Sequence, residues 1–287
     1  MNKMYNLFLF ILLSLLSSYF LFYQSPGIKR IKYLELKKLN YLKTTNKNRL
    51  LIAGGSDVLY AFNSDRIEKE LNIPCVNLGI NVGLGIGYTI DLLNKNMKAG
   101  DTVILCLAYS YYFKPVYHIF SYEYFRMYEK KKLIKINLLR QIYYFFRNMQ
   151  LNFSYVQKKF NIGRSGCYLN VEGMHLSKRK NKPLNFPDTF KETPSLKYIN
   201  NFKQKCEKRN IKLYITYPST LYFKNYTQSK YLIELNDYLK NKFMVIGTPY
   251  DYMTQINHIY NSVYHVNKQG QDIRTTRFIK EFNNIRR

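Results

Sequence analysis

Two residues stand out as able to carry chemistry together, Ser56 near the front of the chain and His265 near its end. Ser56 follows the apolar run 50–53 and two glycines, a pattern that predicts a short buried strand broken by a turn. Open α/β sheets hold their sites at the carboxyl ends of such strands. The same residues would also suit a helix N-cap, because Ser and Asp are favoured there. The stretch alone favours neither interpretation.

His265 lies between the last expected strand and the last expected helix. In a five-stranded doubly wound sheet, that loop and the loop holding Ser56 lie on the same edge. A hydroxyl and an imidazole that meet there can perform acyl transfer, because histidine takes the hydroxyl proton and later returns it to the leaving group. A single histidine in a tyrosine-rich loop is more often structural. The matching topological position of Ser56 favours a chemical role here.

A third feature is the glycine-rich run 77–85. Gly79, at the end of the second expected strand, could offer a backbone N–H to a developing oxyanion, and Asn81 could offer a side-chain N–H. A dinucleotide-binding loop does not fit, because Tyr88 stands where the fingerprint requires glycine and the run follows the second strand. Walker A, H-E-x-x-H and C-x-x-C patterns are also missing from the sequence. We therefore expect neither a cofactor nor a metal.

These residues need a sheet to position them, and the rest of the sequence predicts one. Short apolar strands alternate with helical segments, which is typical of a parallel sheet with right-handed crossovers. The expected fold is a three-layer α/β/α domain with a five-stranded, mostly parallel, flavodoxin-like sheet. Its strands are expected at 50–53, 75–79, 101–108, 211–216 and 243–246. Its helices are expected from a cap at 63–65 through 71, and at 84–96, 195–208, 229–240 and 266–282.

The alternation stops at about 110–194, which we interpret as an insertion. Residues 119–149 are expected to be helical, and 161–194 to form a long loop. The insertion could be a lid over the site or a surface that faces lipid or a partner. Simple packing is the commoner role for most of its residues.

The N-terminus predicts a membrane anchor at 1–24. Residues 5–23 carry no charge, and a helix of that length spans about 28 Å, close to the thickness of a bilayer core. Residues 20–23 lack the small residues of a signal-peptide cleavage site, so the anchor is expected to stay attached. A basic connector with one short helix (25–49) and the α/β domain (50–287) follow. The lysines after the anchor favour a cytosolic domain, although long domains are exported regardless of such charges.

The chain is strongly basic, with 45 Lys and Arg against 18 Asp and Glu and a formal net charge of +27. Such a charge favours anionic partners: nucleic acid, lipid headgroups or acidic polysaccharides. An AT-rich gene would also produce this composition, and the charges are spread along the chain. Since no nucleic-acid-binding motif is present, we expect an anionic glycan or lipid rather than nucleic acid.

The Gly54-Gly55-Ser56 turn, the 77–85 run and Tyr264-His265-x-Asn267-x-x-Gly270 together resemble the SGNH/GDSL hydrolase superfamily. The resemblance covers roughly residues 50–110 and 195–285. It is closest to the membrane-anchored or exported branch associated with bacterial surface-polysaccharide O-acetylation. It implies that Ser56 is the nucleophile and His265 the general base, with Gly79 and the Ser56 amide as the oxyanion hole. It also implies an exported domain.

The sequence departs from the family at one important position. Asn261 stands where the family usually has an acid that orients the histidine. Asp251 and Asp272 are the carboxylates that could replace it. We expect a serine acyl transferase or esterase that acts on acetyl-type esters of a cell-surface glycan through an acyl-serine, with an acyl-donor protein as a conceivable partner. The alternative is a catalytically impaired protein that binds glycan or lipid during polysaccharide assembly.

Overall fold

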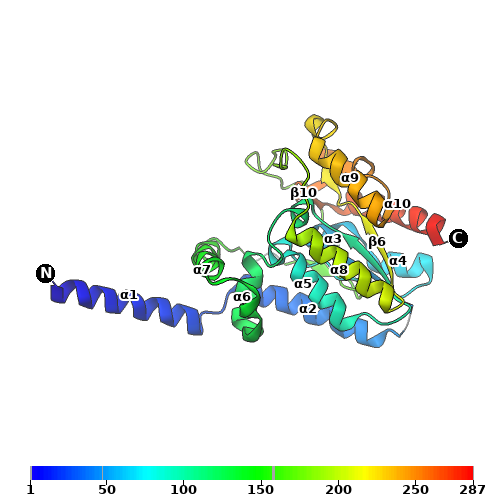
Figure 1. The fold of residues 1–287 in the computed structure, drawn as a ribbon. Coiled ribbons are helices and arrows are strands. Elements are labelled where there is room, and N and C mark those ends of the chain that lie inside the picture. The colour runs from blue at the N-terminus through cyan, green and yellow to red at the C-terminus, as the bar shows by residue number, and fades with distance from the viewer. Residues whose placement is uncertain (1, 47, 157–158, 287) are drawn as a thin grey trace.

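Five parallel strands form the centre of the computed structural model, which describes residues 2–46, 48–156 and 159–286 (Figure 1). They lie in the order β2-β1-β3-β6-β8, which is the flavodoxin-like order 2-1-3-4-5 when these strands are counted along the chain. The predicted sheet is therefore confirmed. The strands are β1 (Leu50–Gly54), β2 (Cys75–Asn77), β3 (Thr102–Cys106), β6 (Lys212–Thr216) and β8 (Met244–Ile246).

Helices cover both faces of this sheet, because alternate side chains of each strand point to opposite faces. Leu51 and Ala53 pack in one core cluster and Leu50 and Ile52 in another, so β1 is buried along its whole length. The first cluster includes α5 (Gly85–Asn96), α8 (Pro194–Lys208) and α9 (Lys230–Lys242). The second includes α3 (Ser56–Ala61), α4 (Ser64–Leu71) and α10 (Lys268–Arg286). The result is the expected three-layer arrangement.

The segment before the sheet differs from the expected connector. It forms a 19-residue helix, α2 (Pro26–Thr44), that begins at the N-cap Ser25 and buries one face. Its Lys38 is fully buried and donates from Nζ to the carbonyl oxygens of Asn77 (2.6 Å) and Gly166 (2.5 Å). Asn77 lies on the edge strand β2, and its N–H donates to the Ser165 carbonyl at 3.0 Å, so α2 and the segment around Ser165 together cover this edge of the sheet.

The insertion also differs from the prediction of one helical stretch. It contains α6 (Ile119–Tyr128), the 3₁₀ segment η3 (Lys130–Lys135) and α7 (Leu138–Phe153). Asn137 begins α7, because its side-chain oxygen accepts the Arg140 N–H at 2.9 Å. The expected loop contains a small antiparallel hairpin of β4 (Asn161–Ile162) and β5 (Tyr168–Leu169). Helices α6 and α7 pack with α2 and α5 around a third apolar cluster.

The N-terminal helix α1 (Asn2–Phe22) extends away from the domain (Figure 1). Within the described residues, only the helical stretch that contains it is long and apolar enough to cross a membrane. At the other end of the chain, the hairpin of β10 (Ile259–Ser262) and β11 (His265–Val266) leads into α10. Two further short strands, β7 (Thr220–Leu221) and β9 (Met253–Thr254), pair outside the main sheet.

A buried ion pair fixes the starts of β1 and β3. The Arg49 guanidinium donates from Nε to Asp101 Oδ1 (3.0 Å) and from a terminal nitrogen to Oδ2 (2.5 Å), and both side chains are almost fully buried. Arg49→Met is expected to lower the free energy of unfolding by about 3 kcal/mol, because it leaves a buried carboxylate without its partner. The midpoint of urea unfolding measures this. Lys43→Met, on the exposed surface of α2, is the control, and equal midpoints for the two variants would contradict the prediction.

Candidate active site

Ser56 is the first residue of α3, and only Gly55 separates it from the end of β1. The last position of β1 requires glycine, since a Cβ on Gly54 would lie 2.0 Å from the Cys106 carbonyl oxygen of β3. This close packing of β1 on β3 puts Ser56 at the carboxyl edge of the sheet, where its side chain lines a pocket.

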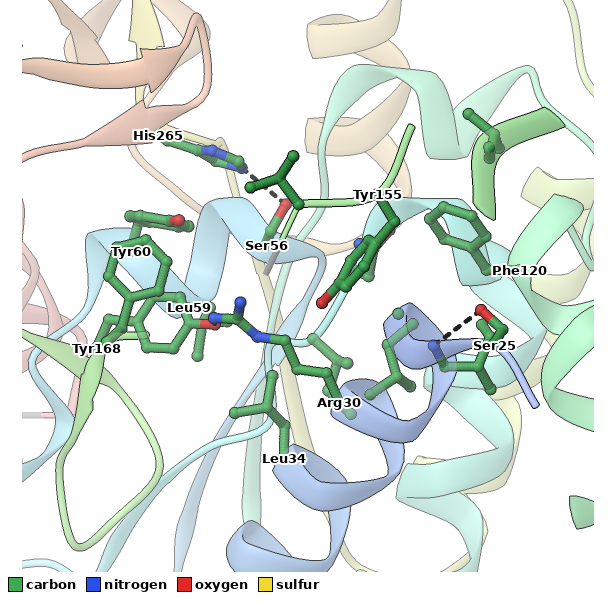
Figure 2. A pocket seen from close by; sticks show the side chains of 18 of the residues that line it. Ser25, Arg30, Leu34, Ser56, Leu59, Tyr60, Phe120, Tyr155, Tyr168 and His265 are labelled. Carbon is green, nitrogen blue, oxygen red and sulfur yellow. Dashed lines mark hydrogen bonds between the residues drawn. The ribbon is translucent and has the colours of Figure 1, made fainter. Parts of the chain in front are cut away.

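His265 reaches the same edge from the other end of the chain. It lies on β11, opposite Ser262 of β10. Its Nε2 is 2.8 Å from Ser56 Oγ, although 209 positions separate the two residues (Figure 2). The structure thus brings the two residues together, as the order of the strands predicts.

Asn261 occupies the other side of the imidazole, with its Oδ1 2.7 Å from His265 Nδ1. An amide oxygen only accepts hydrogen bonds, so in this arrangement Nδ1 carries the hydrogen and the Nε2 lone pair faces the serine hydroxyl. That is the tautomer a general base needs.

The acids that the sequence suggests as substitutes for this role lie elsewhere, so that suggestion is wrong. The Asp251 carboxylate accepts hydrogen bonds from Thr248 and Arg277, and Asp272 is exposed on α10. Asp57, next to Ser56, does not contact the imidazole either, because its carboxyl lies 3.9 Å from the Cys106 sulfur. Burial raises the pKa of Asp57 to about 7.

The imidazole lies in an environment that disfavours its charged form. Burial lowers the pKa of His265 to about 3, and the positive charge of Lys180 acts in the same direction. Asn261 orients the ring but provides no negative charge that would stabilise the imidazolium. The Tyr60 ring stacks on the imidazole with the centroids 4.2 Å apart and the planes 11° from parallel.

We expect Tyr60→Leu to lower kcat for ester hydrolysis about three- to tenfold, because the imidazole loses its stacked ring and with it a fixed orientation. Tyr60→Phe keeps the ring and is the matched control. Steady-state kinetics on a soluble p-nitrophenyl ester separates kcat from KM. A loss in Tyr60→Phe as large as in Tyr60→Leu would show that stacking is not the cause.

The two residues proposed from the sequence as oxyanion donors, Gly79 and Asn81, lie in different surroundings. The Gly79 N–H donates to Asn77 Oδ1 at 3.0 Å, so this amide is already used. A Cβ on Gly79 would lie 2.7 Å from both Gly55 O and Leu59 N, so the glycine is explained by the close approach of this loop to α3. The assignment of Gly79 to the oxyanion hole is therefore not supported. Asn81 does line the pocket, and its Oδ1 accepts the Gly83 N–H at 2.8 Å, which leaves its NH₂ group available.

The pocket itself has a volume of about 340 Å³ and is built from distant parts of the chain. Arg30 of α2 points into it and donates to the Tyr168 hydroxyl at 2.6 Å (Figure 2). The walls include the end of α7 and the segment after it (Leu151, Asn152, Tyr155 and Val156) and the aromatic residues Tyr60, Phe120, Phe160 and Tyr168. Among the described residues, no group of three or more His, Cys, Asp and Glu could hold a metal ion.

The sequence reasoning missed most of this pocket. Tyr60 could have been found, because it lies one helical turn after Ser56 and so on the same face of α3. Arg30 and Tyr155 give no such signal. They reach the site only because α2 and the insertion pack against the domain.

The fold and the site define a class: an α/β protein with a Ser-His-Asn arrangement at the carboxyl edge of a parallel sheet, the geometry that serine-dependent acyl transfer uses. No family model matches the sequence, and no curated protein matches it.

Similar solved structures include a protein named for platelet activating factor from Streptococcus pneumoniae, with 11% identity and a TM-score of 0.41, covering 94% of this chain and 97% of that one. A lipolytic protein of the G-D-S-L family from Desulfitobacterium hafniense DCB-2 has 8% identity and a TM-score of 0.40, covering 82% and 99%. A protein named as a lipase from Chitinophaga pinensis DSM 2588 has 14% identity and a TM-score of 0.31, covering 83% and 98%. Of these neighbours, the second is named as a lipolytic protein of the G-D-S-L family and the third as a lipase.

Proposed function

We propose that this protein is a membrane-anchored serine esterase or acyl transferase of the SGNH/GDSL kind. The observation that carries the proposal is the 2.8 Å contact between Ser56 Oγ and His265 Nε2 at the wall of a pocket large enough for a small ester. Asn261 supports it, because it holds the imidazole in the tautomer that accepts a proton from serine.

The proposed reaction has two steps. Ser56 Oγ attacks the ester carbonyl while its proton moves to His265 Nε2. The tetrahedral intermediate then collapses, and His265 protonates the leaving alkoxide, which leaves an acyl-Ser56. Water or an acceptor hydroxyl, deprotonated by His265, releases the acyl group and restores the serine. The Asn81 NH₂ group and the Ser56 N–H are the proposed donors to the oxyanion.

The proposed substrate is an acetyl-type ester on an anionic cell-surface glycan. The Arg30 guanidinium in the pocket and the net charge of +27 support a negatively charged partner. The glycan, the acyl-donor protein and the export of the domain come from the family resemblance. A reporter enzyme fused to the C-terminus, active on only one side of the membrane, tests the export.

One observation favours a second function. Asn261 carries no charge, and burial lowers the pKa of His265 to about 3, so nothing beside the ring stabilises its protonated form. A protein with such a site could bind a glycan or lipid during polysaccharide assembly without turning it over.

A fluorophosphonate probe separates the two functions. Catalysis predicts a covalent adduct that peptide mapping by mass spectrometry locates on Ser56, and hydrolysis of p-nitrophenyl acetate. His265→Gln is the matched control, because it keeps a polar side chain but removes the base, and it should react far more slowly. If the wild-type protein forms no adduct and hydrolyses no ester, yet binds an anionic glycan, the binding function is correct.

A further inference from the structure

Helix α7 has an apolar face that the domain leaves uncovered. Its other face packs on the domain through the buried Tyr144 and Asn148. The exposed side chains are large and apolar, and Leu139 and Phe153 are 80% and 85% exposed. We call this set the α7 apolar face: Leu138, Leu139, Ile142, Phe146 and Phe153. A face of this size on a folded protein marks a contact surface.

This face lies next to the N-terminal helix. The Phe145 ring contacts the Tyr19 ring edge-on, with centroids 5.5 Å apart. Asn152 Nδ2 donates to the Tyr19 hydroxyl at 2.8 Å, and Ser25 Oγ donates to Asn152 Oδ1 at 2.6 Å. The two helices also share an apolar groove that includes Leu138, Ile142 and Phe146 on the α7 side.

The angle between the two helices is fixed by the domain. Arg126 of α6 donates to the carbonyl oxygens of Phe20 and Tyr23, both at 2.6 Å, and so holds the end of α1. Arg126 is itself held by the buried Glu123. Figure 1 shows α1 along its length and α7 end-on, so their axes cross steeply. If α1 spans a bilayer, α7 lies along the surface of that bilayer.

We propose that α7 is an in-plane membrane helix whose apolar face enters the bilayer beside α1. The charges around the face fit this partner, because the exposed Arg140 and Arg147 on α7 and Lys130 and Lys131 before it can contact anionic headgroups. The end of α7 continues into the pocket wall through Leu151 and Asn152. The Ser56 pocket therefore lies next to the membrane surface, and the glycan that carries its ester substrate is itself attached to a lipid; this last step rests on the proposed function.

The test places a fluorophore on α7 in the full-length protein. The four cysteines are buried, so an environment-sensitive maleimide dye labels Ile142→Cys selectively. The protein is reconstituted in phosphatidylcholine vesicles that contain phosphatidylglycerol and spin-labelled lipid. Lys240→Cys, exposed on α9, is the matched control. We expect a blue-shifted emission and strong quenching by the spin label at position 142, and neither at position 240.

Two outcomes would overturn the proposal. A dye at position 142 that emits as in water places α7 outside the bilayer. A shielded dye that the spin label does not quench, together with crosslinks between copies, shows that a second copy covers the face. Dye emission and quenching do not depend on catalysis, so this experiment tests the position of α7 whether or not Ser56 is a nucleophile.

A second experiment tests the substrate. The double variant Leu139→Ser, Phe146→Ser should hydrolyse soluble p-nitrophenyl acetate at the wild-type rate. Its hydrolysis of an ester carried on a vesicle lipid should fall about tenfold, because two side chains that enter the bilayer are lost. Gln150→Ser, also exposed on α7, is the control and should change neither rate. If the double variant hydrolyses the lipid-borne ester as fast as the wild type, or loses both activities equally, the lipid-borne substrate is wrong.

Discussion

Replacing Ser56 by alanine is expected to lower kcat for ester hydrolysis by at least about 10³-fold and to remove the fluorophosphonate adduct. Ser56 Oγ is the hydroxyl that His265 Nε2 contacts at 2.8 Å, and without it no acyl-enzyme can form. Loss of a triad serine leaves only the rate that binding and the oxyanion donors provide.

The fold should survive this change, because alanine suits the first turn of α3 and the serine hydroxyl makes no contact with the core. Ser56→Cys keeps a nucleophile at the same position and is the matched control: it should react with a thiol-directed probe and retain some turnover. A Ser56→Ala protein with the circular dichroism spectrum and the turnover of the wild type would show that another group performs the reaction.

Replacing Asn261 by aspartate is expected to raise kcat by a factor of about 10² to 10⁴. The change is nearly isosteric and keeps an oxygen beside His265 Nδ1, where Asn261 Oδ1 now lies at 2.7 Å. It adds the negative charge that stabilises the imidazolium in the transition state. The reverse change in a serine protease costs about 10⁴ in kcat, part of which comes from the wrong histidine tautomer.

The pH dependence of kcat/KM checks the cause of this gain. In the wild-type protein, burial lowers the pKa of His265 to about 3, so the imidazole stays neutral and the rate should be level from pH 8 down to about pH 5. An adjacent carboxylate favours the protonated ring and raises this pKa. The acidic limb of the Asn261→Asp profile should therefore move upward, toward the ordinary histidine value of about 6.5. If Asn261→Asp raises the rate but the acidic limb of its pH profile stays where it is in the wild type, the added charge beside His265 is not the cause of the gain.

Much of the fold could be predicted because its signals are local. Apolar runs such as 50–53 identify the buried strands, and their alternation with helices implies a parallel sheet of the observed order. That order also predicts that Ser56 and His265 meet. The loop after the first strand holds Ser56, the loop before the last helix holds His265, and both loops lie on the same edge of the sheet. Asn261 comes from the family resemblance, as the residue in the position of the usual acid, and in the structure its Oδ1 lies 2.7 Å from His265 Nδ1.

The errors have two kinds of cause, a contact between distant residues for Lys38 and local hydrogen bonds for Gly79 and Asn137. Lys38 looked like part of a solvated basic connector, but two carbonyl groups accept hydrogen bonds from it in the interior. Gly79 matched a motif, yet its amide is taken by Asn77 and its missing side chain makes room for α3. The break between α6 and α7 depends on a cap at Asn137 inside a segment whose composition is helical throughout.

The cover that α2 forms over β2 has a practical consequence for work with shortened versions of this protein. A fragment cut before Leu50 would remove the helix with its buried Leu34 and Leu42, and it would leave the Asn77 carbonyl of the edge strand without its hydrogen bond from Lys38. Such a fragment would self-associate through that strand. A version that omits only α1 and begins at Ser25 would retain the N-cap of α2 and with it the helix that covers β2.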